Sequence, residues 1–348
     1  MHQPHKNTND ASRRDFLQWM GAGALAMSLP IPMAAASSLL PAAATAAKKP
    51  TRARGIYVPT IVPFNKDGSI NEGELRRIVS WLIEKGVHGL YPNGSTGEFV
   101  RLSFEERLRV VEIVAAENRG RVPIMAGVSD NDLDLVATAA KRFADLGCLA
   151  ISVTGPYYFK VSADGVEAYF REVVRRCPGD ILLYNIPQFA NEIPLDVVKR
   201  LAQDFPRIIG IKDSSRDMPR FLNTLHAVQA LRPDFAVFSG CEEILLPCLW
   251  MGGNGGTVAT AGVVPELFVK LFDDFQAQRW DACKEMQFKL LDLIALLQKT
   301  GNFPQGFRAG VALRGFDPGP PRLPMTEKEQ ANLEEAKPQI AAMLKGLI

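Results

Sequence analysis

From residue 55 onward, the chain alternates eight times between a short apolar run and a longer helix-like stretch. Short apolar runs bounded by turn residues are typical of buried parallel strands. Eight strand-then-helix units, at spacings of about 25 to 30 residues, predict a (β/α)8 TIM barrel of the α/β class. A doubly wound open sheet is the alternative. The predicted strands cover residues 55–62, 89–92, 123–127, 149–153, 181–185, 208–212, 236–239 and 256–260.

Helix signals fill the segments between these runs and continue after the eighth. Ser103 followed by Glu106 fits a capping box and predicts a helix start. Three further helix-like stretches lie at 282–298, 303–313 and 327–347, which exceeds what a barrel needs. We therefore expect a C-terminal helical extension that packs on the barrel or on a partner subunit, with a Pro-rich linker at 317–321. The predicted domains are a signal peptide and linker at 1–47, the barrel at 55–278 and the extension at 279–348.

The first residues have the pattern of an export signal. Arg13 and Arg14 form a twin-arginine pair, and an apolar stretch at 19–29 follows it. This stretch is shorter than the roughly 20 residues of a membrane-spanning helix. Small residues with Ala-x-Ala cleavage patterns come next, between positions 33 and 47. The pattern predicts export by the twin-arginine route and a periplasmic location, with no stable membrane association after cleavage. An uncleaved anchor is the alternative.

Composition excludes several classes of protein. Lys and Arg total 40 and Asp and Glu total 38, and no basic stripe is present, so nucleic acid is not an expected partner. An odd number of cysteines without a C-x-x-C motif indicates free thiols, with a Cys148–Cys177 disulfide as the alternative. Neither His88 nor His226 lies in a metal-ligand pattern, and no G-x-S-x-G motif occurs. We expect neither a metal nor a cofactor.

One lysine ends a predicted buried strand. Lys212 closes the apolar run Ile208-Ile209-Gly210-Ile211 and precedes Asp213-Ser214-Ser215. Burial disfavours the charged form of an amine, which makes a neutral nucleophile accessible near neutral pH. Amines of this kind form Schiff bases with carbonyl compounds, so the pattern predicts imine chemistry on a 2-oxo acid. A strand-end lysine that extends to water is the alternative.

Other polar clusters follow other predicted strands. Because TIM-barrel chemistry takes place at the C-terminal ends of the strands, segments far apart in sequence should meet there. The clusters are Gly94-Ser95-Thr96-Gly97-Glu98 after the second strand, Thr154-Gly155-Pro156-Tyr157-Tyr158 after the fourth and Ser239-Gly240-Cys241-Glu242-Glu243 after the seventh. The glycine-flanked turn at Ser95 and Thr96 has the character of an anion site.

In these motifs the chain resembles the dihydrodipicolinate synthase / N-acetylneuraminate lyase family of class I, pyruvate-type aldolases. The resemblance spans residues 55–313, and the motifs occur in the order and at the spacing of that family. They are Pro59-Thr60-Ile61-Val62-Pro63-Phe64, Gly94-Ser95-Thr96-Gly97-Glu98, Val153-Thr154-Gly155-Pro156-Tyr157-Tyr158, Tyr184-Asn185-Ile186-Pro187 and Gly210-Ile211-Lys212-Asp213.

The resemblance implies a role for each residue. Lys212 would form the imine, Tyr158 would carry protons, and Ser95 would join that relay. Thr96 and Ser95 would bind the carboxylate of the oxo acid, and Tyr184 would line the site. Three further residues near the mouth would bind the rest of the substrate, namely Ser214, Gly240 and Glu242. Glu242 starting a helix is the alternative for that residue.

One position departs from the lysine-pathway branch of the family. That branch carries an arginine for a second substrate carboxylate two residues after the proline of Tyr-Asn-x-Pro, and this chain has Phe189 there. An apolar ring cannot form a bidentate charge pair. The acidic and hydroxyl residues near the seventh strand instead favour a hydroxylated substrate, such as a 2-oxo-3-deoxy sugar acid.

The leading functional hypothesis is a cofactor-free Schiff-base aldolase that cleaves such an acid to pyruvate and an aldehyde. One alternative keeps the imine but ends in dehydration, in hydration, or in a condensation like that of dihydrodipicolinate synthase. Another is a non-catalytic periplasmic protein that binds oxo acids. The resemblance also implies a homo-oligomer, a tetramer or a dimer.

Overall fold

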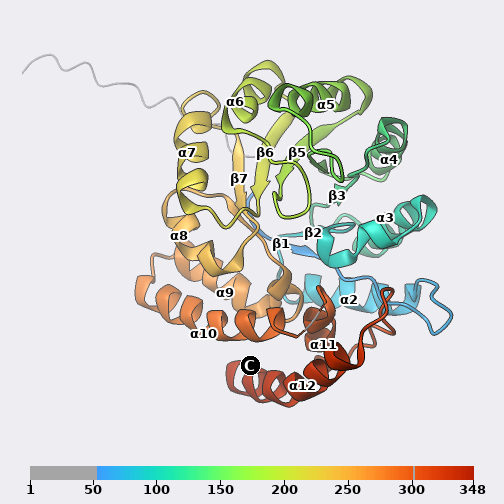
Figure 1. Ribbon diagram of the computed structural model, residues 1–348. Coiled ribbons are helices and arrows are strands. Elements are labelled where there is room, and N and C mark those ends of the chain that lie inside the picture. Colours follow the sequence, from blue (N-terminus) through green and yellow to red (C-terminus); the bar gives the residue numbers. More distant parts are fainter. Residues whose placement is uncertain (1–52, 301) are drawn as a thin grey trace, which may run out of the picture. The chain divides into compact units, whose positions relative to one another are not determined.

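The computed structural model describes residues 53–300 and 302–348, which form eight parallel strands alternating with helices (Figure 1). The predicted signal segment lies outside the described residues. The strands are β1 (Gly55–Pro59), β2 (Gly89–Tyr91), β3 (Met125–Gly127), β4 (Ala150–Thr154), β5 (Asp180–Asn185), β6 (Ile208–Asp213), β7 (Ala236–Ser239) and β8 (Gly255–Thr257). Each overlaps a predicted strand, because strands covered on both faces are apolar runs.

The strands pair in the order β2-β1-β8-β7-β6-β5-β4-β3. A single parallel bridge between Leu90 and Ile124 joins the two ends of this order, so the sheet is a nearly closed barrel. The prediction of a TIM barrel is confirmed, and the open sheet is excluded.

Helices surround the barrel and connect its strands (Figure 1). They are α2 (Glu72–Glu84), α3 (Phe104–Asn118), α4 (Leu133–Asp145), α5 (Ala163–Arg176), α6 (Leu195–Asp204), α7 (Met218–Gln229), α8 (Leu245–Trp250) and α9 (Pro265–Gln276). The capping box predicted from Ser103 and Glu106 is present at the start of α3. None of the described helices has the length and apolar content needed to cross a membrane.

Two buried clusters stabilise the barrel. One lies between the strands and the surrounding helices. The other fills the barrel interior with side chains that come mostly from the strands, and in it Tyr57 and Phe238 meet edge to face at 5.5 Å. Since both faces of each strand are packed, the strand ends form a rigid rim on which site residues can be held.

The helices after the eighth unit are α10 (Trp280–Gln298), α11 (Gln305–Leu313) and α12 (Glu327–Leu347), and they pack on one side of the molecule (Figure 1). α10 contacts α9, α11 and α12. The segment at 317–321 has no regular structure, but it is not a free linker. Arg308 of α11 donates hydrogen bonds to the carbonyl oxygens of Pro318, Gly319 and Pro320, which hold the segment against the barrel.

Candidate active site

Lys212 lies at the next-to-last position of β6, and only 4% of its surface is exposed. Its Nζ atom is 4.0 Å from the centre of the Tyr184 ring and 4.5 Å from the centre of the Tyr91 ring. The amine is therefore flanked by two phenol rings inside the barrel mouth. The alternative in which this side chain extends into water is excluded by its burial.

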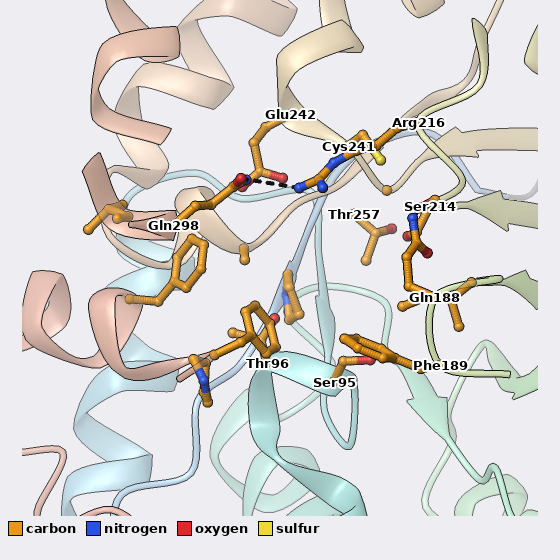
Figure 2. Close-up of a pocket in the computed structure, with 18 of the residues that line it drawn as sticks. Ser95, Thr96, Gln188, Phe189, Ser214, Arg216, Cys241, Glu242, Thr257 and Gln298 are labelled. Atoms are coloured by element: carbon orange, nitrogen blue, oxygen red, sulfur yellow. Dashed lines mark hydrogen bonds between the residues drawn. The ribbon is translucent and has the colours of Figure 1, made fainter. Parts of the chain in front are cut away.

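A cavity of about 280 Å³ opens at the C-terminal ends of the strands, and Lys212 lies in its wall (Figure 2). This volume is at the small end of the range for ligand pockets, which suits a small organic acid. The C-terminal ends of six strands, or the loops that follow them, line the cavity together with the end of α10, the start of α11 and the segment between them. Its polar lining residues are Ser95, Thr96, Tyr184, Gln188, Lys212, Ser214, Arg216, Cys241, Glu242, Thr257, Gln298 and Asn302.

The turn after β2 places two hydroxyl side chains at the cavity. Ser95 and Thr96 begin the 3-10 helix η1 (Ser95–Gly97), and Thr96 is buried. The Ser95 hydroxyl lies 3.4 Å from the Tyr184 hydroxyl, a longer separation than the roughly 2.8 Å of a strong hydroxyl pair. Glu98 ends the turn in the left-handed region, with φ 57°, and its carboxylate forms an ion pair with Arg308. The turn is thus fixed from beneath by the C-terminal extension.

The two candidate tyrosines occupy different positions. Tyr184 of β5 is the register partner of Lys212 of β6, so its phenol faces the amine across adjacent strands. Tyr158 has a left-handed backbone, with φ 74°, and 89% of its surface is exposed. It does not line the cavity. The expected position of Tyr158 beside the amine is corrected, because this backbone geometry turns the side chain away from the mouth of its own chain.

Residues from the loops after β6 and β7 form the opposite wall. Ser214, Gly240 and Glu242 all line the cavity as predicted. A Cβ atom at Gly240 would lie 1.9 Å from the Ser214 hydroxyl, so glycine makes room for that side chain. The Glu242 carboxylate accepts hydrogen bonds from the N–H and the hydroxyl of Thr260, at 3.0 and 2.7 Å. Complete burial raises the pKa of Glu242. Glu242 also starts the short 3-10 helix η3 (Glu242–Ile244).

Cys241 lies in the same wall and is buried. Burial raises the pKa of this thiol to about 12, so it stays protonated near neutral pH and is a poor nucleophile. All five cysteines are free, and Cys148 and Cys177 form no disulfide. Within residues 53–300 and 302–348, no group of three His, Cys, Asp or Glu side chains is arranged to hold a metal.

Sequence reasoning missed several lining residues. Arg216 lies in the loop after β6, only four residues beyond Lys212, so its place on the predicted rim was a usable signal. Gln188 donates a hydrogen bond to the Ser214 carbonyl at 3.0 Å. Gln298 and Asn302 come from the C-terminal extension, and no local pattern shows that this segment reaches the cavity.

Comparison with known proteins agrees with this geometry. The profile of the dihydrodipicolinate synthetase family matches residues 52–345. The chain belongs to this family. Its members are lyases of the aldolase type, and the protein is accordingly a carbon–carbon lyase.

Three similar proteins illustrate the range of the family. A 4-hydroxy-tetrahydrodipicolinate synthase of Methanopyrus kandleri is 34% identical over 80% of this chain and 93% of its own length. An uncharacterized DapA-like lyase of Thermofilum pendens is 33% identical over 83% of this chain and 97% of its own. The solved structure of 2-keto 3-deoxygluconate aldolase from Picrophilus torridus is 31% identical, covers 73% of this chain and 90% of its own, and superposes with a TM-score of 0.69.

Proposed function

We propose that this lyase is a Schiff-base aldolase that cleaves a hydroxylated 2-oxo acid, of the 2-oxo-3-deoxy sugar acid class, to pyruvate and an aldehyde. The observation that carries the proposal is the buried amine of Lys212 between two phenol rings in the wall of the cavity. Lysine amines in such surroundings attack carbonyl carbons. The similarity to the Picrophilus torridus aldolase supports the substrate class.

In the proposed reaction, the amine of Lys212 attacks the 2-oxo carbon to form a carbinolamine. The carbinolamine then loses water to give a protonated imine. The imine withdraws electrons, so the bond between C3 and C4 breaks while the C4 hydroxyl loses its proton. This releases the aldehyde and leaves an enamine, which gains a proton at C3 and is hydrolysed to pyruvate. We assign the proton transfers to Tyr184, whose hydroxyl lies near Ser95, instead of Tyr158.

The substrate would span the cavity. Ser95 and Thr96 would bind the 2-oxo carboxylate, because both line the same cavity as Lys212 and the Ser95 hydroxyl lies 3.4 Å from that of Tyr184. Ser214 and Glu242 would receive the hydroxyl groups of the aldehyde half, with Gly240 leaving the room for them. Phe189 also lines the cavity, at the position of the second-carboxylate arginine of the lysine-pathway branch.

Trapping with pyruvate and borohydride tests the proposal. Reduction of the imine should leave a stable adduct on Lys212, located by peptide mass spectrometry. Lys212→Ala should lose both the adduct and turnover of 2-oxo-3-deoxy sugar acids. Lys289→Ala is the matched control, since this half-exposed lysine pairs with Glu285 on α10. Turnover by Lys212→Ala would refute the mechanism, and absence of any adduct on the unmodified protein would favour a binding protein.

A panel of 2-oxo acids separates the remaining alternatives. Release of pyruvate with an equimolar aldehyde supports the aldolase. Loss of water without pyruvate release indicates a dehydratase, and consumption of pyruvate with an amino aldehyde indicates a condensation of the dihydrodipicolinate type.

Location and assembly belong to the same proposal. Arg13 and Arg14 support export to the periplasm, and replacing both with lysine should retain the protein in the cytoplasm of its host. We also propose a homo-oligomer. Tyr158 and Phe159 are 89% and 74% exposed and meet edge to face, and apolar side chains exposed in this way are typical of subunit interfaces. Sedimentation of the Tyr158→Ala/Phe159→Ala variant tests this, with dissociation expected.

A further inference from the structure

The cavity holds a second basic side chain besides Lys212, on the side opposite Ser95 and Thr96 (Figure 2). Lys212 and Arg216 are the two basic residues among the described residues that line it. In Figure 2, Arg216 extends across the mouth toward Gln298, while Ser95 and Thr96 lie on the far side of the cavity. A substrate held by Ser95 and Thr96 at one end would therefore present its other end to Arg216.

Only one of the three guanidinium nitrogens of Arg216 donates a hydrogen bond to another of the described residues. Its Nη2 donates to Gln298 Oε1 at 3.1 Å and lies 3.4 Å from Glu243 Oε1. Nη1 and Nε have no hydrogen-bond partner in the described part of the chain. By contrast, Arg109 binds the Glu72 carboxylate through two nitrogens, with Nε and Nη2 each 2.6 Å from a carboxylate oxygen. Arginine binds carboxylate and phosphate groups through two donors on one edge, as Arg109 does with Nε and Nη2. Nε and Nη1 of Arg216 lie on different edges, so each is available to a ligand as a single donor or together with the second hydrogen of Nη2.

The backbone at Arg216 supports a functional role. Its φ is 64°, in the left-handed region that a residue with a side chain adopts at a cost of about 1 to 2 kcal/mol. Residues held in such conformations cluster at ligand sites, where a particular side-chain direction is needed. Here the left-handed residue lies within the loop between β6 and α7, and its side chain lines the cavity.

The neighbouring acids leave room for an anion. Burial raises the pKa of Glu242, so this carboxyl opposes a bound anion less than an exposed one would. Glu243 Oε1 is shared between Arg216 and Gln298, which donates to it at 3.1 Å. Arg216 lines the cavity and Glu243 does not, so this acid adds no carboxylate to the cavity wall.

We propose that Arg216 binds a second anionic group, at the end of the substrate opposite its 2-oxo carboxylate. The substrate is then a 2-oxo-3-deoxy sugar acid that ends in a carboxylate or a phosphate, and not in a neutral hydroxymethyl group. This inference rests on the proposed aldolase function. It assigns to the loop after β6 the recognition that Phe189 cannot perform in the loop after β5.

Matched substrates test the inference. Three 2-oxo-3-deoxy acids of equal chain length are compared, ending in a hydroxymethyl, a carboxylate or a phosphate group. We expect kcat/KM to be about 10- to 100-fold higher for at least one charged substrate, the range of one charge-assisted hydrogen-bonded pair. Preference between carboxylate and phosphate identifies the group.

Variants locate the preference on the residue. Arg216→Ala should bring the charged-to-neutral ratio of kcat/KM close to one, and Arg216→Lys should keep part of it, since it retains the charge but not the fork. Glu243→Gln should raise the ratio by releasing the guanidinium. Arg175→Ala is the control, because this arginine pairs with Glu172 on the surface of α5.

The two proposals fail in different ways. If the parent protein traps pyruvate on Lys212 but prefers the neutral substrate, only the role of Arg216 is wrong. The same holds if Arg216→Ala keeps the charged-to-neutral ratio of the parent. If no adduct forms, the aldolase proposal fails first, and the inference about Arg216 falls with it.

Discussion

Arg308 is the residue whose replacement should disturb both stability and the site. It belongs to α11, and only 2% of its surface is exposed. Its guanidinium donates to the carbonyl oxygens of Val62, at 2.7 Å, and of Pro318, and it pairs with Glu98 at 3.3 Å. One side chain thus connects the first barrel loop, the turn that carries Ser95 and Thr96, and the segment after α11.

Arg308→Met keeps the length of the side chain and removes its donors. Breaking a buried ion pair by deleting one partner costs about 3 to 5 kcal/mol. Leaving the carbonyls of Val62 and Pro318 without this donor costs about 1 to 3 kcal/mol each, a sum of similar size. Glu98 keeps a second partner in Arg101, which favours the lower part of the range. We expect the free energy of unfolding to fall by about 3 kcal/mol.

Urea denaturation followed by circular dichroism measures this loss, at one protein concentration so that assembly does not shift the midpoint. Arg175→Met is the control, because the Arg175 side chain is 66% exposed and pairs with Glu172 on the surface of α5. Its replacement should leave the free energy of unfolding near that of the parent, because exposed ion pairs contribute little to stability. Because Glu98 ends the turn that carries Ser95 and Thr96, Arg308→Met should also raise KM for the 2-oxo acid. An unfolding free energy of Arg308→Met equal to that of Arg175→Met would refute the reasoning.

Three further predictions concern the cavity. Tyr184→Phe should lower kcat for aldol cleavage by about 100- to 10,000-fold, which is the range for loss of one proton-transfer group. The control is Tyr169→Phe, which should leave kcat near that of the parent, because the Tyr169 hydroxyl donates to the Asp130 carbonyl away from the cavity. Equal effects of the two substitutions would contradict the assignment. The pKa of Glu242 is higher in the folded protein than in the unfolded one, so the parent loses stability as pH rises from the unfolded pKa through the folded pKa. The Tm of Glu242→Gln should therefore rise relative to that of the parent between pH 4.5 and pH 8. Thermal melts of both proteins at these two pH values check the sign. Burial raises the pKa of Cys241 to about 12, so this thiol should resist iodoacetamide at pH 7.5 in the folded protein and react with it in urea. Rapid labelling of Cys241 in the folded protein, located by peptide mapping, would show that the thiol is not buried and protonated as described.

The barrel was predictable from the sequence because each strand and each helix leaves its own pattern of apolar residues along the chain. Strands buried on both faces must be apolar, and the helices between them must cover that surface, so the alternation is visible along the chain. The burial of Lys212 follows from the same reasoning, because this residue lies within a strand that is covered on both faces. The capping box at Ser103 is equally local.

The sequence did not show which tyrosine lies beside the amine. Tyr184 and Lys212 each occupy the next-to-last position of neighbouring parallel strands, and in the structure the two are register partners. The register of adjacent strands, which places the phenol beside the amine, is not visible in the sequence of either strand. The outward direction of Tyr158 depends on a left-handed backbone, which no residue type in its motif announces.

The contribution of the C-terminal extension was hidden for a different reason. Arg308 and Glu98 are 210 residues apart, and a pair at such separation leaves no periodic trace. The segment at 317–321 had the composition of a linker, yet its carbonyls satisfy the donors of a buried guanidinium. Composition reports the lack of regular structure there correctly, but it cannot report what the backbone groups bind.

The extension is therefore part of the site and not an addition to a complete barrel. Strand ends supply the amine, its phenol partner and the hydroxyls, and these positions are rigid because both faces of each strand are packed. The last residue of α10, Gln298, and the following segment, with Asn302, line the opposite wall, where Gln298 hydrogen-bonds to both Arg216 and Glu243. Under the proposed function, this segment and the loop after β6 would contact the aldehyde half of the substrate, whereas the strand ends would carry out the imine chemistry.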